Sequence, residues 1–319
     1  MKPFCFSLAV VAAATALFAS PATALNILIT NDDGLTSNVK ALYDTLRSAG
    51  HDVLVSLPCS PQSGRSGAIV MYSSSTIDAE ADPQIRTENG CHNGAAPVGA
   101  PAAGPFTKAG YTQGDWHYVH GTPVTATFYG LDIVGKQRWG KAPDLVLSGP
   151  NEGQNIGAVI IHSGTVANAQ AALGRGIPAM ALSADADTAD DTGLANPRSK
   201  LVAQLTLQLL DRLIAQRGNG PLLPQGMALN VNFPASVTSH TAFAFSRIGS
   251  YQGYEIGFSV ERGVYGLSFA PNRNKPTSEQ MEDESAVARH KVAVSAMQFA
   301  YEQRPAAQEW LRQRLQSTR

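Results

Sequence analysis

Two aspartates stand side by side directly after an early apolar run. Residues 26–30 predict a strand buried on both faces, and the turn sequence Asn31-Asp32-Asp33-Gly34 follows at once. Adjacent carboxylates repel each other, so a positive charge usually lies beside them. A divalent cation is the simplest candidate, because hard cations prefer oxygen ligands. The alternative interpretation is a polar strand-to-helix turn in which one aspartate caps the helix.

Two other strand ends add neutral polar groups. A Gly/Ser loop containing Ser63 follows the apolar run at residues 52–57, and Asn151 follows the run at residues 145–148. Ligands bind at the carboxyl ends of the strands in an open parallel sheet, so this hydroxyl and amide are expected beside the aspartates. The set offers only oxygen atoms, which favours Mg²⁺, Mn²⁺ or Ca²⁺ over zinc.

A helix start supplies a second kind of site. Ser163-Gly164-Thr165 should open a helix with free backbone N–H groups and two hydroxyls, and such helix N-termini bind phosphate. A cation beside a phosphate cradle indicates phosphoester chemistry.

Alternating strands and helices position these groups. A helix over residues 39–46, with Asn38 as its cap and Gly50 as its stop, joins the first two strands into a βαβ unit, which implies a parallel sheet. The pattern continues with a helix at 166–173, a strand at 179–182, a helix at 201–213 and a strand at 228–233. We therefore expect an α/β fold, a three-layer Rossmann-like sheet that is mostly parallel, in a catalytic domain over residues 25–235.

Two segments depart from this pattern. Residues 73–118 are rich in Ser, Gly, Ala and Pro and predict a functional loop or a poorly ordered insertion. Residues 236–319 carry aromatic strands around 242–269, a predicted helix at 284–301 and a polar helical tail at 306–318. We expect this end to form an arm outside the central sheet that serves oligomer contacts.

Composition excludes some classes of protein. The 319 residues include 24 basic and 25 acidic side chains, with a formal net charge of −1 and 44% hydrophobic residues. Disorder needs more net charge and less hydrophobicity, and nucleic acid binding usually needs a basic face, so neither is expected.

The N-terminus predicts a secretory signal peptide over residues 1–24. Lys2 is its only charge, an apolar run extends from Phe4 to Phe18, and Ala22-Thr23-Ala24 is an A-x-A cleavage site. The chain should therefore be exported, periplasmic or secreted, with no membrane contact after the signal is removed. The alternative is an uncleaved anchor or a buried first helix.

Two cysteines remain once Cys5 leaves with the signal. Cys59 and Cys91 could form one disulfide in an exported protein, or could stay as two unpaired thiols.

Five motifs occur in a fixed order along the chain. They are Ile29-Thr30-Asn31-Asp32-Asp33-Gly34, Gln62-Ser63-Gly64, Gly121-Thr122-Pro123, Ser148-Gly149-x-Asn151-x-Gly153-x-Asn155 and Ser163-Gly164-Thr165-Val166. Together they resemble the SurE family of 5′/3′-nucleotidases. Leu229-Asn230-Val231-Asn232-Phe233-Pro234 is similar to that family's late strand, so the resemblance covers residues 25–235.

The resemblance implies a divalent-metal-dependent phosphomonoesterase that acts on nucleoside 5′(3′)-monophosphates, with broad acid-phosphatase activity in an exported member. It implies one cation per subunit, held by Asp32, Asp33, Ser63 and Asn151, of which both aspartates and Asn151 are catalytic. It implies a phosphate site at Asn155, Ser163, Gly164 and Thr165. An exchanged C-terminal arm in a homodimer or homotetramer is a further implication.

Several residues depart from the family pattern or carry more than one interpretation. The departures are His120, Pro150, Glu152 and His162, and they bear on substrate preference. His162 could protonate the leaving alkoxide, or could pack where the family has an aromatic ring. His117 and His120 are interpreted as structural or rim residues. Trp116, Tyr111 and Tyr118 could stack on a base, or could simply pack.

A different class of function remains open at this stage. The chain could be a secreted protein that binds nucleotide or phosphate without turnover. The intact set of candidate ligands argues against this alternative. The sequence contains no Gly-x-Ser-x-Gly elbow that would indicate a covalent serine nucleophile.

Overall fold

The computed structural model describes residues 24–111, 114–299 and 305–316. Of the predicted signal peptide at 1–24, only Ala24 falls within these ranges, so the prediction itself lies outside the described residues. No helix in the described ranges combines the length and apolar character that crossing a membrane requires.

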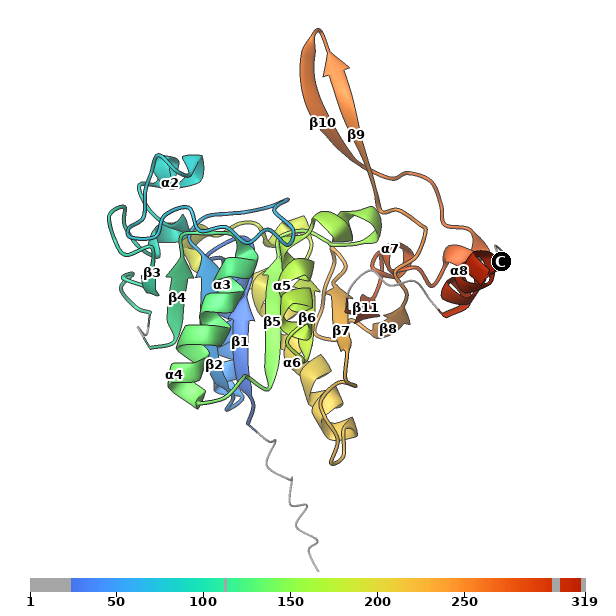
Figure 1. The fold of residues 1–319 in the computed structure, drawn as a ribbon, viewed down its shortest axis with the longest axis horizontal. Helices are drawn as coiled ribbons and strands as arrows, with labels where there is room; N and C mark the ends of the chain where they lie inside the picture. The colour runs from blue at the N-terminus through green and yellow to red at the C-terminus, as the bar shows by residue number, and fades with distance from the viewer. Residues whose placement is uncertain (1–23, 112–113, 300–304, 317–319) are drawn as a thin grey trace, which may run out of the picture.

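A nine-stranded sheet forms the centre of the molecule (Figure 1). Its strands lie in the order β3-β4-β2-β1-β5-β6-β7-β11-β8. The parallel centre runs from β4 to β7, while β3 and β11 pair antiparallel with β4 and β7. The strands are β1 (Asn26–Thr30), β2 (Asp52–Pro58), β3 (Ala103–Pro105), β4 (Trp116–Val119), β5 (Leu145–Asn151), β6 (Ala179–Ser183), β7 (Met227–Asn232), β8 (Phe243–Ser246) and β11 (Val292–Gln298). The predicted α/β fold with a mostly parallel sheet is confirmed.

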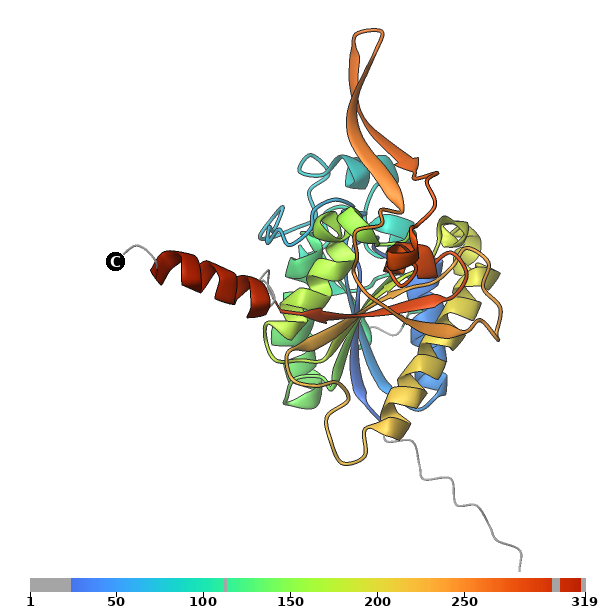
Figure 2. The same ribbon diagram turned by 90° about the vertical axis from the view of Figure 1, so that its right-hand side faces the viewer.

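Helices cover both faces of the sheet (Figure 2). One face carries α1 (Ser37–Ser48) and α6 (Pro197–Gln216), and the other carries α3 (Pro123–Tyr129), α4 (Gly135–Trp139) and α5 (Gly164–Leu173). Because side chains alternate along a strand, Ile27 and Ile29 of β1 pack in the core under α1 and α6, and Leu28 packs in the core under α5. The three layers place the carboxyl ends of β1, β2 and β5 at one edge.

The start of α1 differs from the prediction. Thr36, and not Asn38, is the N-cap, because its hydroxyl accepts a hydrogen bond from the Val39 backbone N–H. The Asn38 side chain is buried and donates to the Thr188 hydroxyl at a distance of 2.9 Å.

The insertion at residues 73–118 has more structure than its composition predicts. It contains α2 (Pro83–Glu88), the 3₁₀ turn η1 (His92–Gly94) and β3, and it ends within β4. The sulfur atoms of Cys59 and Cys91 are bonded, which ties η1 to the end of β2. Trp116 and Tyr118 are buried, and Tyr111 packs edge-on against Trp116, so the packing interpretation of these aromatics is confirmed.

The C-terminal part corrects two predictions. Only α7 (Glu284–Val287) is helical within the predicted helix at 284–301; residues 292–298 form β11, and residues 300 and 301 lie outside the described ranges. Residues 292–298 form a strand because they pair with β7, and this pairing buries the side chains of Val292, Ala293 and Met297. The expectation that residues 236–319 lie outside the central sheet is therefore wrong for β8 and β11.

Two elements do project from the body. The hairpin of β9 (Tyr254–Glu261) and β10 (Val264–Pro271) extends well beyond the sheet, and α8 (Pro305–Gln316) points away at the side (Figures 1 and 2). The helical tail predicted at 306–318 is confirmed as far as residue 316.

A buried glutamate joins the C-terminal part to the sheet. The Glu284 carboxylate accepts hydrogen bonds from the Gly157 backbone N–H at 2.8 Å and the Asn230 amide at 3.1 Å. Burial raises the pKa of Glu284 to about 7, although these two hydrogen bonds oppose the shift. The native state therefore holds this proton more tightly than the unfolded chain.

This shift predicts a loss of stability on ionisation. Native Glu284 binds more proton than the unfolded chain between pH 4.5 and about 7, so the free energy of unfolding should fall as the pH rises through this window. The free energy of unfolding of wild type should fall by about 3 kcal/mol between pH 5 and 8, at 1.36 kcal/mol per pKa unit. This fall is measured relative to Glu284→Gln, which lacks the ionising group. Urea unfolding of both proteins at several pH values measures the difference. Parallel pH profiles would contradict the assignment.

Candidate active site

The turn after β1 buries both aspartates. The Asn31 side chain closes the turn, since its amide nitrogen donates to the Gly34 carbonyl at 2.7 Å and its oxygen accepts from the Gly34 N–H at 3.1 Å. Gly34 has φ +82°, a left-handed conformation that favours glycine. Asp32 and Asp33 are 3% and 7% exposed, so the turn presents two carboxylates that water reaches little.

The loop after β2 lies against this turn. The Gln62 backbone N–H donates to the Asp32 backbone carbonyl at a distance of 2.7 Å. Ser63, the next residue, is exposed. The backbone of Gln62 thus joins the start of this loop to the Asp32 turn, and the role of Ser63 as a cation ligand stays a prediction.

The end of β5 supplies the amide. The Asn151 side-chain nitrogen donates to the Gly153 carbonyl at 2.8 Å, which orients the amide and leaves its oxygen as the atom a cation would take. The backbone of Glu152 hydrogen-bonds to Asp33, so this strand end also contacts the aspartate turn.

The start of α5 closes over Asp32. The Thr165 hydroxyl donates to Asp32 Oδ1 at 2.6 Å. A Cβ added at Gly164 would lie 2.7 Å from the Asp32 Cβ, so the helix backbone approaches the carboxylate as closely as glycine allows. Ser163 is the N-cap and accepts from the Val166 N–H at 3.1 Å. The predicted phosphate-binding segment and the predicted ligand pair are therefore in direct contact.

Asn155 supports this arrangement from behind. Its amide nitrogen donates to the Ser183 hydroxyl at 2.8 Å and to the Thr165 hydroxyl at 3.3 Å. The structure makes Asn155 a buried residue that positions Thr165; a contact with phosphate stays a prediction for this residue.

The electrostatics of the site are unfavourable without a positive charge. Burial raises the pKa of Asp32, against the hydrogen bond from Thr165. Burial and the charges of Asp32 and Glu152 raise the pKa of Asp33 well above its ordinary value. Burial, followed by the charge of Asp191, raises the pKa of Glu152 to about 7, although His92 opposes this. Carboxyl groups that ionise so reluctantly would gain from a cation.

The donor set fits a hard divalent cation. Asp33 Oδ2 is buried and has no hydrogen-bond partner, which is costly unless a ligand takes it up. Within the described ranges, no three His, Cys, Asp or Glu side chains come together as ligands, so a cation here relies on two carboxylates and neutral oxygens. That oxygen-rich set suits Mg²⁺, Mn²⁺ or Ca²⁺.

Comparison with known proteins agrees with this geometry. The family model described as "Survival protein SurE" matches residues 27–254. The chain belongs to the SurE family. An acid phosphatase of Yarrowia lipolytica is 33% identical over 215 residues, and the match covers 65% of this chain but only 56% of that protein.

Two SurE proteins extend the comparison. The 5′-nucleotidase SurE of Lawsonia intracellularis is 30% identical over 234 residues, which cover 72% of this chain and 74% of that protein. The crystal structure of the Aquifex aeolicus SurE protein superposes with a TM-score of 0.61 over 90% of this chain and 99% of its own, at 22% identity. The structural match shows the shared fold.

Two residues beside the aspartate turn could not be predicted from the sequence: Asn93 of the insertion and Asp191 of the loop before α6. The Asp191 carboxylate accepts from the Ser37 N–H at 2.6 Å, and its charge acts on Asp33. The Asn93 amide donates to the Leu35 carbonyl at 2.8 Å. Neither residue stands in a motif or at the end of a predicted strand, so only the folded chain places them here.

His117, His120 and His162 differ in their burial. His117 and His120 are buried, in agreement with the structural interpretation. His162 is exposed at the end of the 3₁₀ turn η3 (Gly157–His162), so the alternative that it packs like an aromatic ring is wrong. Its role as a proton donor stays a prediction.

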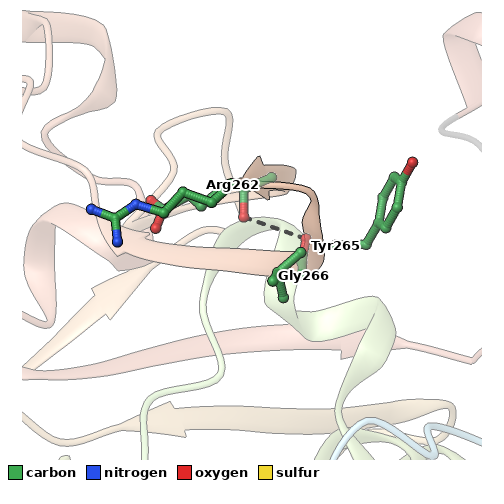
Figure 3. Close-up of a pocket in the computed structure, with 6 residues that line it drawn as sticks. Arg262, Tyr265 and Gly266 are labelled. Atoms are coloured by element: carbon green, nitrogen blue, oxygen red, sulfur yellow. Dashed lines mark hydrogen bonds between the residues drawn. The ribbon is translucent and has the colours of Figure 1, made fainter.

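Two hollows lie outside the aspartate turn. An apolar cavity of about 620 Å³ adjoins Ser163 and is lined by Phe128, Ile160 and Phe299 among others. A second hollow of about 550 Å³ lies at the tip of the β9–β10 hairpin, where Arg262 and Tyr265 point to opposite sides (Figure 3). The hairpin hollow is formed within one hairpin and contains none of the residues predicted to react.

Proposed function

We propose that this chain is a metal-dependent phosphomonoesterase that hydrolyses nucleoside 5′- and 3′-monophosphates to nucleoside and phosphate. One observation carries the proposal: the hydroxyl of Thr165, at the start of the phosphate-binding helix, donates to Asp32 of the buried aspartate pair. A phosphate held by the helix start would therefore lie against the cation ligands. Membership of the SurE family, with 5′-nucleotidase and acid phosphatase relatives, supports the same activity.

The residues divide between two tasks. Asp32, Asp33, Ser63 and Asn151 would hold one divalent cation per subunit, either Mg²⁺, Mn²⁺ or Ca²⁺. A bound cation of this kind polarises a phosphoryl group and lowers the pKa of a bound water. Ser163, Gly164 and Thr165 would orient the phosphate through the Ser163 hydroxyl hydrogen and the N–H groups of the helix start. The backbones of Gly164 and Thr165 also hydrogen-bond to Asp32, so a bound phosphate would share these donors with the carboxylate. His162, which is exposed and directly precedes Ser163, would give a proton to the leaving alkoxide.

Phosphate release from a substrate panel tests the proposal. The panel contains 5′-AMP, 3′-AMP and p-nitrophenyl phosphate, each with Mg²⁺, Mn²⁺ or Ca²⁺ and with excess chelator. We expect release from the nucleotides that stops in the chelator, and release from the aryl ester if the acid-phosphatase activity is broad. Nucleotide binding without phosphate release under every metal would favour the alternative, a binding protein without turnover.

Export is proposed from two features. Residues 1–24 have the composition of a signal peptide. The Cys59–Cys91 disulfide suits an oxidising compartment such as the periplasm or the exterior. Cell fractionation with an antibody to the mature chain tests this. A full-length protein that stays in the cytoplasmic fraction would contradict it.

A homodimer or homotetramer is proposed from the projecting hairpin. The cross-strand pairs Val260–Tyr265, Phe258–Leu267 and Ile256–Phe269 lie on one face of the hairpin, and Leu267 is 81% exposed. Glu255, Ser259 and Ser268 occupy the other face. An apolar face of this kind is normally covered, and a second copy of the chain would cover it.

Replacing Leu267 with glutamate should break this contact. A charge in the centre of the apolar face must be desolvated on association, so we expect a smaller species than wild type in light scattering after size exclusion. Ser268→Glu is the matched control, because the neighbouring side chain points to the polar face. Equal masses for wild type and both variants would show that the hairpin does not hold the oligomer.

A further inference from the structure

The segment that follows Asp33 is held between two loops from distant parts of the chain. It comprises residues 34–37 and links the aspartate turn to α1. A Cβ at Gly34 would lie 3.2 Å from the His92 Cβ, so η1 of the insertion packs directly on the turn. The Asn93 amide reaches further and donates to the Leu35 carbonyl at 2.8 Å.

Asp191, from the loop before α6, holds the other end of the same segment. Its Oδ1 accepts from the Ser37 N–H at 2.6 Å, and its Oδ2 accepts from the Asn93 amide at 2.9 Å. Asn93 and Asp191 therefore form a clasp on residues 34–37. Asn93 is bonded to Leu35, Asp191 is bonded to Ser37, and the two side chains are bonded to each other.

The disulfide fixes where this clasp stands. Cys91 immediately precedes η1 and is bonded to Cys59, the first residue after β2. The His92 backbone N–H also donates to the Cys59 carbonyl at 2.7 Å. Asn93 has φ 51°, a conformation that asparagine tolerates better than most residues, and this turns its side chain toward the segment.

We propose that the disulfide-tethered clasp of Asn93 and Asp191 positions the aspartate turn and thereby raises its affinity for the divalent cation. The reason is the repulsion between Asp32 and Asp33. Two adjacent carboxylates separate if the backbone lets them, and a turn that must be reassembled binds a cation more weakly than a preorganised one. The inference rests on the proposed function, since it concerns the cation that this function needs.

Calorimetric titration of Mn²⁺ into purified protein tests the clasp. Asn93→Gly removes the side-chain hydrogen bonds to Leu35 and Asp191, together with the one to His92, and keeps a residue that accepts a left-handed backbone. Loss of a residue that supports metal ligands typically costs 10- to 100-fold in affinity, and we expect a Kd for Mn²⁺ raised by about 10-fold. The Mn²⁺ concentration for half-maximal activity should rise equally, with kcat at saturating Mn²⁺ within about twofold of wild type.

Asn89→Gly is the matched control. Asn89 lies two residues before Cys91, as Asn93 lies two residues after it; it also has a positive φ, of 55°, and is exposed at the end of α2. This variant should bind Mn²⁺ as wild type does.

Asn93→Asp gives a second measurement should the glycine variant fail to fold, since a carboxylate there cannot donate to Leu35 and repels Asp191. The variant Cys59→Ser/Cys91→Ser should weaken Mn²⁺ binding in the same direction.

The outcomes separate this inference from the proposed function. Wild-type affinity in both Asn93 variants would overturn the clasp and leave the nucleotidase proposal standing. Wild-type protein that binds no Mn²⁺ and releases no phosphate would overturn the proposed function, and the clasp with it.

Discussion

Asp32→Asn should lower kcat/KM for a nucleoside monophosphate by on the order of 10³-fold, the equivalent of about 4 kcal/mol. The amide has the shape of the carboxylate, and its oxygen still accepts from the Thr165 hydroxyl, so the start of α5 stays in place. What disappears is the negative charge that would hold the cation. Phosphate release with Mg²⁺ or Mn²⁺ measures the effect.

Stability distinguishes this result from misfolding. Asp32 and Asp33 repel each other in the native state, so the neutral variant should unfold at the same temperature as wild type or a higher one. Asp44→Asn on the exposed face of α1 is the control for charge, because Asp44 is exposed and pairs with Lys40 at the surface. Full activity in Asp32→Asn would remove the aspartate pair from the mechanism.

Gly164→Ala should lower kcat/KM by about 100-fold, because misplacement of reacting groups by about 1 Å costs this much. The new methyl group would lie 2.7 Å from the Asp32 Cβ and 2.9 Å from its Oδ2, and Asp32 has no room to retreat because it is buried. Either Asp32 or the start of α5 must move. Such overpacking also costs about 1–3 kcal/mol of stability.

Gly114→Ala controls for the substitution itself. A Cβ at Gly114 meets no atom of the described residues within 4 Å, so activity and unfolding temperature should match wild type. A Gly164→Ala variant with wild-type kcat/KM would mean that the contact between α5 and Asp32 does not matter for catalysis.

The parts of the fold that local signals specify were predicted well. The apolar run of β1 and the turn that follows it are read from adjacent residues, and so are the stretches that became α5, α6 and β7. Elements with a weak local signal were missed. The helical stretch at 123–139 contains Gly130, where an added Cβ would lie only 2.8 Å from Leu28 Cδ1, so the close packing requires glycine. A glycine inside a helix weakens the helical signal in the sequence.

The edge of the sheet shows why the rest needed tertiary structure. Residues 292–298 carry apolar side chains that fit a helix as well as a strand, and their pairing with β7 selects the strand. The sequence alone therefore misassigned β11 and placed β8 outside the sheet.

The candidate ligands Asp32, Asp33, Ser63 and Asn151 and the segment at 163–165 could be named from the sequence, because parallel strands bring their carboxyl ends to one edge. The hydrogen bond from Thr165 to Asp32, and the clasp of Asn93 and Asp191 behind the turn, appear only in the folded chain. Residues 32 and 165, or 93 and 191, are far apart in sequence, and only long-range packing decides which side chains meet.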